Sequence, residues 1–258
     1  MKEILYGRQA VRECLRAHRR HIHRVLLAEG VKETGIITEI LTLAQALKVP
    51  SAHVPRVYLE GLSEAAQGVG LEVGAYPYVS VDEILKSAQK YHEPPFLLAL
   101  DHLQDPHNFG ALVRTAEAVG VHGVIIPERR AVGVTPAVVS ASAGASEHMR
   151  IAQVTNLVRT LKALKTEGVW IVGLENTPDS LLYHTADLNR PLVLLVGAEG
   201  LGISRLARET CDMVIRLPMR GHVQSLNASV AGGIALYAAW AARGFPSHSV
   251  DTHPRFVL

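Results

Sequence analysis

Residues 192–242 constrain the fold of this chain more than any other stretch. They contain two short apolar runs, at 192–196 and 214–217, and each run is followed by a polar loop that contains glycine, at 197–202 and 219–227. A continuous apolar run that ends at a glycine or a proline is typical of a buried strand. Because ligands bind in open α/β sheets where strands end and loops begin, these two loops form the first candidate site.

A long helix is expected after the second loop. Small residues recur along it at spacings of four and three, which places them on one helical face. They are Ala228, Gly232, Ala235, Ala239 and Ala242. Such a face lets another backbone approach closely. Its neighbour could be a helix of the same chain, a second copy of the chain in a dimer, or a cofactor that lies against the helix.

The composition allows a large core and gives no sign of a metal site. The chain has 258 residues, enough for one large domain or two modest ones, and 48% of them are hydrophobic. The formal net charge is only +2, so any contact with nucleic acid must come from local patches. Cys14 and Cys211 lie too far apart to predict a zinc site or a disulfide framework. His21 and His23 have no carboxylate cluster beside them, so no metal ligation is expected there.

We expect no targeting or membrane segment. The first residues lack the apolar stretch of a signal peptide. The longest apolar run, at 228–242, is too short to span a bilayer. These patterns predict a soluble, cytoplasmic protein.

Residues 1–79 predict a small α/β domain. Helices are expected at 7–17, 34–48 and 57–62, strands at 25–28 and 49–54, and an edge strand or exit segment at 71–81. Arginines recur every four residues in the first part of this domain and form a basic stripe: Arg8, Arg12, Arg16 and Arg20. Guanidinium groups at this spacing suit phosphate oxygens, and the alternative is a solvated helix face with nothing bound.

A linker is expected at 80–95. Ser80 followed by Glu83 forms a capping-box pattern that predicts a short helix, and the proline pair at 94–95 marks the domain boundary. A second, larger α/β domain should then occupy 96–243, with a flexible tail at 244–258.

Alternating apolar runs and helix-like segments in this second domain predict a parallel sheet. Further strands are expected at 96–100, 121–126 and 169–174, and helices at 111–119, 154–166 and 177–182. The Ser- and Ala-rich segment 140–146 predicts close packing.

The glycine loop alone identifies no chemistry. Glycines after a strand can admit a phosphate, but they can also simply form turns. The dinucleotide fingerprint, the phosphate-binding loop that ends in Gly-Lys-Ser/Thr, the nucleophile elbow and the H-E-x-x-H zinc motif do not occur in the sequence.

Three motifs in a fixed order are more specific. They are D-P-H-N-F-G-A-L-V-R-T-A from residue 105, L-V-G-A-E-G-L-G from residue 195, and L-P-M from residue 217 with S-L-N-A-S-V-A from residue 225. Together they resemble the signature motifs of the SpoU-type RNA 2′-O-ribose methyltransferases. The first residues also look like the N-terminal RNA-binding domain of the 23S rRNA guanosine-2′-O-methyltransferase branch. One departure is Ala66, where the family often has a histidine before Gln-Gly-Val.

The resemblance implies an α/β fold with a deep C-terminal trefoil knot of the SPOUT type, S-adenosylmethionine as the cofactor, and a homodimer with its site at the subunit interface. By motif match, the cofactor contacts fall on Gly197, Leu217 and Leu226. The catalytic or RNA-side roles fall on Asn108, Arg114, Glu199, Ser225 and Asn227.

The reaction itself needs a ribose 2′-hydroxyl to lose its proton as it attacks a sulfonium methyl group in line. A guanidinium stays protonated in proteins, so Arg114 is expected to hold a phosphate and to stabilise the developing oxyanion. A phosphate oxygen or Glu199 would take the proton. In the alternative interpretation, Arg114 is an ordinary exposed helix residue, Ser225 or Asn227 caps the last helix, and Asn108 caps the helix that follows it.

The resemblance implies a guanosine in 23S rRNA as the target, and a tRNA ribose is the alternative. The contrasting class is an RNA-binding protein of the same fold without catalytic activity.

Overall fold

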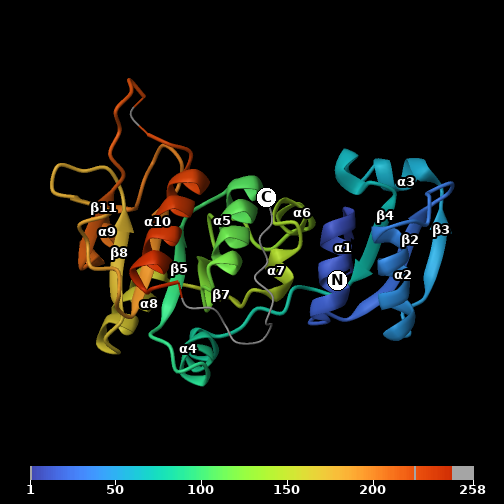
Figure 1. Ribbon diagram of the computed structural model, residues 1–258, viewed down its shortest axis with the longest axis horizontal. Helices are drawn as coiled ribbons and strands as arrows, with labels where there is room; N and C mark the ends of the chain where they lie inside the picture. The colour runs from blue at the N-terminus through green and yellow to red at the C-terminus, as the bar shows by residue number, and fades with distance from the viewer. Residues whose placement is uncertain (1, 224, 246–258) are drawn as a thin grey trace.

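The computed structural model describes residues 2–223 and 225–245, which form two α/β units that pack side by side (Figure 1). The N-terminal unit has a four-stranded sheet in the order β1-β4-β2-β3. Its elements are β1 (Glu3–Tyr6), α1 (Arg8–Ala17), β2 (Ile22–Ala28), α2 (Ile36–Ala46), β3 (Ser51–Val54), α3 (Arg56–Glu60), the 3-10 helix η1 (Glu64–Ala66) and β4 (Val69–Val73).

The segment 71–81, expected to be an edge strand or an exit segment, starts inside the sheet and then leaves it. β4 ends at Val73 and pairs antiparallel with β1 on one side and with β2 on the other, so it lies inside the sheet. Every residue of β4 is buried, which is why the segment reads as a nearly continuous apolar run. Past Gly74 and Pro77 the chain leaves the sheet, and Val79 forms an isolated bridge with Ala152 of the second unit.

The second unit is built on a seven-stranded sheet in the order β7-β6-β5-β10-β8-β11-β9, in which every pair is parallel. Its strands are β5 (Phe96–Asp101), β6 (Gly123–Pro127), β7 (Ile151–Val154), β8 (Trp170–Leu174), β9 (Leu181–Leu182), β10 (Leu192–Gly197) and β11 (Met213–Arg216). Its helices are α4 (Val81–Lys90), α5 (Pro106–Ala118), α6 (Pro136–Ala141), α7 (Ala145–His148), α8 (Leu157–Thr166), α9 (Arg205–Thr210) and α10 (Ala228–Ala242).

Helices cover both faces of this sheet (Figure 1). Along β5, Phe96, Leu98 and Leu100 join the core under α5 and α10, while Leu97 and Ala99 join the core under α4 and α8. The side chains alternate in this way because a strand points successive residues to opposite faces. Burial on both faces explains the unbroken apolar runs of the sequence.

Two helix boundaries differ from expectation. α5 begins at Pro106 rather than at residue 111, because Asp105 caps it by accepting hydrogen bonds from the backbone N–H groups of His107 and Asn108. α8 begins after Asn156, which caps it in the same way, and Val154 belongs to β7.

The helix expected at 177–182 is absent and the prediction is wrong. Ser180 Oγ donates to the Thr177 carbonyl at 2.6 Å and accepts from the Thr177 N–H, which closes a turn. Leu181 and Leu182 then form β9, which pairs with β11. Proline at 178 is as suitable for a turn as for a helix start, and here the side-chain hydrogen bonds of serine decide the outcome.

The segment expected to be a linker is packed on the second sheet. The predicted capping box is present, since Ser80 Oγ accepts from the Glu83 N–H and Glu83 Oε2 accepts from the Ser80 N–H. Ile84 of α4 is fully buried and lies against the backbone of Gly123 in β6. Helix α4 therefore contributes to the core of the second unit. Most of the expected flexible tail at 244–258 lies outside the described residues.

The basic stripe of the sequence does not form one free surface. Arg12 and Arg16 of α1 both pair with Glu13 and Glu39. Burial raises the pKa of Glu13, but hydrogen bonds from His148 and Arg12 and the charge of Arg16 outweigh it and hold that pKa at about 2.

Within the described residues, no helix has the length and apolar character needed to cross a membrane.

Arg20 lies after α1 ends and is completely buried between the two units. Its guanidinium donates to both oxygens of Glu147 at 2.8 and 2.9 Å and to Glu3 at 3.0 Å, and it lies over the Tyr76 ring. The Tyr76 hydroxyl donates to the carbonyl of Met149 at 2.6 Å. Arg20 therefore joins the two units, which overturns its expected place in an exposed stripe.

Candidate active site

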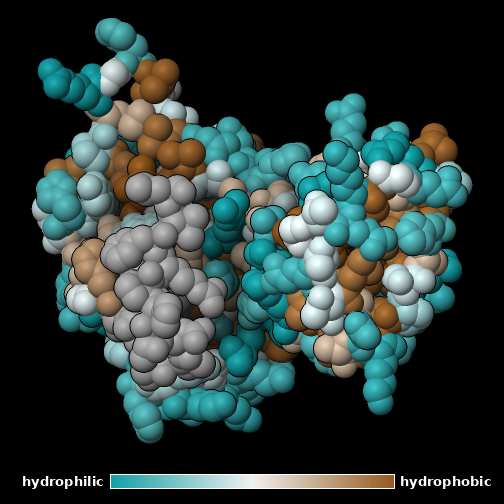
Figure 2. Space-filling model, turned by 45° about the vertical axis from the view of Figure 1, so that its right-hand side comes forward, coloured by the Kyte–Doolittle hydropathy of each residue, from teal (hydrophilic) through white to brown (hydrophobic). Residues whose placement is uncertain are grey.

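The loops after β10 and β11 meet at the carboxyl edge of the second sheet, as the apolar runs predict. They enclose a cavity of about 570 Å³, which we call the cofactor cavity because the family resemblance places its expected cofactor contacts there. The end of β8 and the start of α10 complete its walls. Around the cavity the structure brings together five of the predicted site residues: Gly197, Glu199, Leu217, Ser225 and Leu226. Beside the projecting loop that follows β11, apolar surface gathers in Figure 2.

The glycine loop forms a closed turn that depends on its glycines. Ala198 and Gly202 exchange two backbone hydrogen bonds, of 3.2 and 2.8 Å. Gly200 and Gly202 have positive φ angles of 77° and 67°, which favour glycine. A Cβ at Gly197 would lie 2.1 Å from the carbonyl carbon of Gly202, so the two backbones pack directly on each other. The turn gives the cavity a thin wall made largely of backbone.

This close approach gives a first prediction. Gly197→Ala should open the turn, because the added methyl group has no space between residues 197 and 202. We expect the affinity for S-adenosylmethionine, measured by calorimetry, to fall below detection while the chain still folds. Gly74→Ala is the matched control, since a Cβ at Gly74 would meet only ordinary contacts, the nearest at 3.6 Å. Normal cofactor binding by the Gly197→Ala variant would contradict this role of the turn.

A second cavity of about 500 Å³ lies against the other side of the same turn. It is lined by the loop between β5 and α5, by Arg130 and by the turn residues, and Glu199 and Gly202 line both cavities. Asn108 Nδ2 donates to Glu199 Oε2 at 3.0 Å, which links the first motif to the second. Asn108 is buried at the third position of α5, so its predicted alternative role as the N-cap is wrong and Asp105 fills that position.

Asn227 caps α10, as the alternative interpretation expected. Its Oδ1 accepts from the backbone N–H of Ser229 at 2.9 Å and of Val230 at 3.4 Å. Ser225 makes no such cap and lines the cofactor cavity instead. Leu217 is half-buried and Leu226 is 37% exposed, so both present apolar surface to that cavity.

Arg114 does not join the other candidate residues within one chain. It is exposed on α5, and it makes no hydrogen bond or ion pair with any described residue. It lines neither the cofactor cavity nor the second cavity. The next residue, Thr115, borders a shallow apolar surface formed mainly by Val230, Ile234 and Tyr237 of α10.

Several residues of the cofactor cavity were not predicted from the sequence. Glu175 follows β8, and its Oε1 accepts from the Ile203 N–H at 3.2 Å and lies against Gly202, while its Oε2 pairs with Arg208. Asn176, Arg216 and Met219 also line the cavity. The expected strand at 169–174 was the available signal, because its carboxyl end must lie at the same sheet edge as the two loops.

The face of α10 that carries the small residues serves mainly for packing within the chain. A Cβ at Gly232 would lie 2.4 Å from Leu112 Cδ2 of α5, and Ala235 and Ala239 are buried. Ala228 lines the cofactor cavity, so the first turn of the helix has a second use. Ala242 is exposed.

Among the described residues, no group of three or more His, Cys, Asp or Glu side chains is placed to hold a metal ion.

Comparisons with known proteins agree with this architecture. A model of the SpoU rRNA methylase family matches residues 95–237, and a model described as RNA 2′-O ribose methyltransferase substrate binding matches residues 4–79. A TrmH family tRNA/rRNA methyltransferase of Bacillus subtilis is 43% identical over 242 residues, which cover 93% of this chain and 96% of that protein. One from Staphylococcus saprophyticus is 42% identical and covers 95% of this chain and 98% of that protein.

Solved structures show the same fold. The SpoU methyltransferase AviRb from Streptomyces viridochromogenes, in complex with AdoMet, superposes with a TM-score of 0.78 at 22% identity, over 94% of this chain and 90% of that one. A TrmH/SpoU tRNA modifying enzyme from A. aeolicus gives a TM-score of 0.53 at 32% identity, over 63% of this chain and 84% of that one.

Proposed function

Because this chain belongs to the SpoU family of RNA methyltransferases, we propose that it transfers a methyl group from S-adenosylmethionine to a ribose 2′-hydroxyl of RNA. The observation that carries the proposal is the cofactor cavity, where the second and third motifs meet although residues 203–216 separate them in the sequence. Its volume lies within the range of about 300–1,000 Å³ that is usual for small-ligand sites.

The lining of the cavity fits an adenosylated amino acid. Leu217, Leu226 and Met219 offer apolar contacts for a nucleobase, and Glu175 and Arg216 offer charged groups for a ribose and a zwitterion. The bound cofactor supplies an electrophilic methyl group on a sulfonium centre. The closed turn from Gly197 to Gly202 would form the wall between the bound cofactor and the second cavity.

The RNA side of the reaction belongs, in this proposal, to Asn108, Glu199 and Arg114. Asn108 orients the Glu199 carboxylate through the hydrogen bond at 3.0 Å. Glu199 or a phosphate oxygen takes the proton of the 2′-hydroxyl. Arg114 stays protonated, holds the neighbouring phosphate and stabilises the developing oxyanion. Ser225 would contact the bound cofactor or a phosphate, and Asn227 fixes the start of α10 beneath it.

A homodimer would complete this site. Arg114 lines neither of the two cavities of its own chain, while Val230, Ile234 and Tyr237 expose apolar surface beside it. Two copies that pack through this surface of α10 would bury it and could bring Arg114 of one subunit to the partner's cofactor. The exposed Arg114 and the exposed apolar surface beside it then have one common explanation. The trefoil knot remains a prediction from the family resemblance.

We further propose that residues 1–79 bind RNA, that residues 96–243 carry the reaction, and that the target is a guanosine of 23S rRNA. The curated relatives are named for tRNA and rRNA together, so a tRNA ribose remains the alternative.

The proposed reaction is tested by methyl transfer from labelled S-adenosylmethionine to unmodified transcripts of 23S rRNA and, separately, of tRNA. We expect label on one ribose 2′-oxygen of the rRNA, located by mapping the labelled nucleotide. Label on tRNA alone would keep the chemistry and replace the substrate. A protein that only binds RNA would produce no label and no heat on calorimetric titration with the cofactor.

A further inference from the structure

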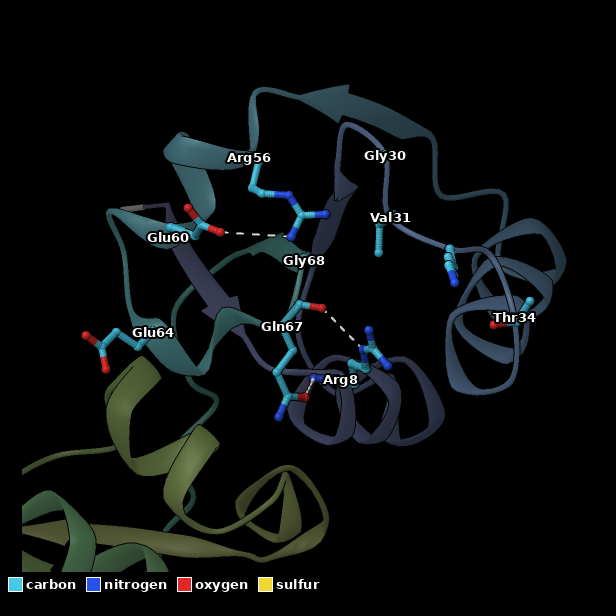
Figure 3. A pocket seen from close by; sticks show the side chains of 10 residues that line it. Arg8, Gly30, Val31, Thr34, Arg56, Glu60, Glu64, Gln67 and Gly68 are labelled. Carbon is cyan, nitrogen blue, oxygen red and sulfur yellow. Dashed lines mark hydrogen bonds and ion pairs between the residues drawn. The ribbon is translucent and has the colours of Figure 1, made fainter.

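Another ligand-sized cavity lies in the N-terminal unit, apart from the two cavities at the glycine turn. It measures about 780 Å³ and is enclosed by the start of α1, the loop between β2 and α2, helix α3, and the turn before β4 (Figure 3). We call it the N-terminal cavity. Three cationic residues line it: Arg8, Lys32 and Arg56. None of the proposed reaction steps uses these residues.

Two of these cations face each other. In Figure 3 the guanidinium groups of Arg8 and Arg56 extend into the gap from opposite walls, Val31 lies on a third side, and the Glu64 side chain turns away from the gap. Arg8 comes from the first turn of α1 and Arg56 from the first turn of α3. Because the two guanidinium groups lie on opposite walls, a single anionic group can contact both.

The donors of these cations are largely unused. The Arg8 side chain donates only its Nε–H, to the Gln67 carbonyl at 3.2 Å, so both terminal amino groups remain available within the described structure. Arg56 has one long ion pair, 3.9 Å from Glu60, between two exposed side chains, and such pairs contribute little. The Lys32 ammonium has no hydrogen bond or ion pair with any described residue. By contrast, Arg12, Arg16 and Arg20 of the basic stripe are already neutralised by carboxylates.

The backbone orients one of these donors. Gln67 has a left-handed φ of 55°, which is unusual for a residue with a side chain, and Gly68 follows with a φ of 77°. This turn aims the Gln67 carbonyl at Arg8 Nε and brings Gly68 to within contact of Val31. The result is a cavity with the apolar side chain of Val31 on one side and the guanidinium groups of Arg8 and Arg56 facing into it.

We propose that the N-terminal cavity binds one unpaired nucleotide of the substrate RNA, with its phosphate held by Arg8, Lys32 and Arg56 and its sugar against Val31. Guanidinium groups bind phosphate oxygens through paired, charge-assisted hydrogen bonds. Recognition of RNA by proteins commonly uses nucleotides that are free of a helix. This inference rests on the proposed RNA methyl transfer and names the place where the RNA is anchored outside the reacting site.

The test uses the double variant Arg56→Gln/Lys32→Gln, in which both side chains are exposed and two charges are removed. The probe is the unmodified transcript that the wild-type protein methylates. We expect KM for RNA to rise about tenfold and the slope of log binding constant against log salt to decrease by about 1, because the three cations hold a single phosphate. The kcat at saturating RNA and the cofactor affinity should stay unchanged.

The matched control is Lys48→Gln/Lys90→Gln, which removes the same charge from exposed lysines outside the cavity. Equal KM and equal salt slope in the two double variants would overturn the proposal, whether both match the wild type or both are weakened. A short hairpin with one bulged nucleotide should also bind the wild type more tightly than its fully paired version, and equal binding would exclude an unpaired-nucleotide site. If the wild-type protein methylates no RNA, the proposed function fails first and the two failures are distinguishable.

Discussion

Arg114→Ala is expected to lower kcat for RNA methylation by about 100- to 1,000-fold, the effect of removing one preorganised oxyanion donor. Arg114 is exposed and makes no contact with a described polar group that would be orphaned, so folding should not suffer. Cofactor affinity should also be unchanged, because Arg114 does not line the cofactor cavity. Single-turnover methyl transfer and calorimetry measure the two quantities. Wild-type turnover in this variant would remove Arg114 from the proposed mechanism.

The same variant tests whether the site spans two subunits. An Arg114→Ala protomer keeps an intact cofactor cavity, while a Gly197→Ala protomer keeps Arg114 but should lose the cofactor. Each homodimer should be inactive, and mixing the two after dissociation should restore transfer, because the mixed dimer contains one complete site. Arg114→Lys is the charge control and should remain well below wild type, since lysine lacks the paired donors of a guanidinium. No restored activity in mixed dimers would place the whole site within one chain.

Arg20→Ala is expected to lower the free energy of unfolding by about 3–5 kcal/mol, as found when one partner of a buried ion pair is removed. The reason is that Glu147, which is 1% exposed, would keep a buried charge without its bidentate partner. In the wild type, burial lowers the pKa of Arg20 and the Glu147 carboxylate raises it, with a net increase, so Arg20 stays charged. Chemical denaturation with far-ultraviolet circular dichroism measures the loss.

Arg24→Ala is the matched control for this effect. Arg24 also forms a bidentate pair, with both oxygens of Glu72 at 2.7 Å, but its side chain is 49% exposed. Its loss should therefore matter far less. The apolar double replacement Arg20→Met/Glu147→Leu should recover much of the stability lost in Arg20→Ala, because no charge is then buried. Equal losses for Arg20→Ala and Arg24→Ala would contradict the importance of burial between the two units.

The sequence determined the parts of this protein that depend on local pattern. The apolar runs that became β5, β10 and β11 leave a continuous signal, and β5 and β10 are buried along their whole length. The capping box at Ser80 and the glycine turn at 197–202 were predictable because each depends on neighbours within a few residues. The three motifs identified the family, which the matched family models confirm.

Tertiary structure decided which polar groups meet. Asn108 and Glu199 are 91 positions apart, and Arg20 and Glu147 are 127 apart, so no local pattern predicts either pair. The regular spacing of arginines suggested one basic surface, but carboxylates from α2 and α7 neutralise most of it and leave Arg8 beside a different cavity. The sequence shows that a side chain is charged. Whether that charge is available to RNA depends on the distant carboxylates that folding brings next to it. This physical difference explains why the fold and family could be predicted from the sequence and the N-terminal cavity could not.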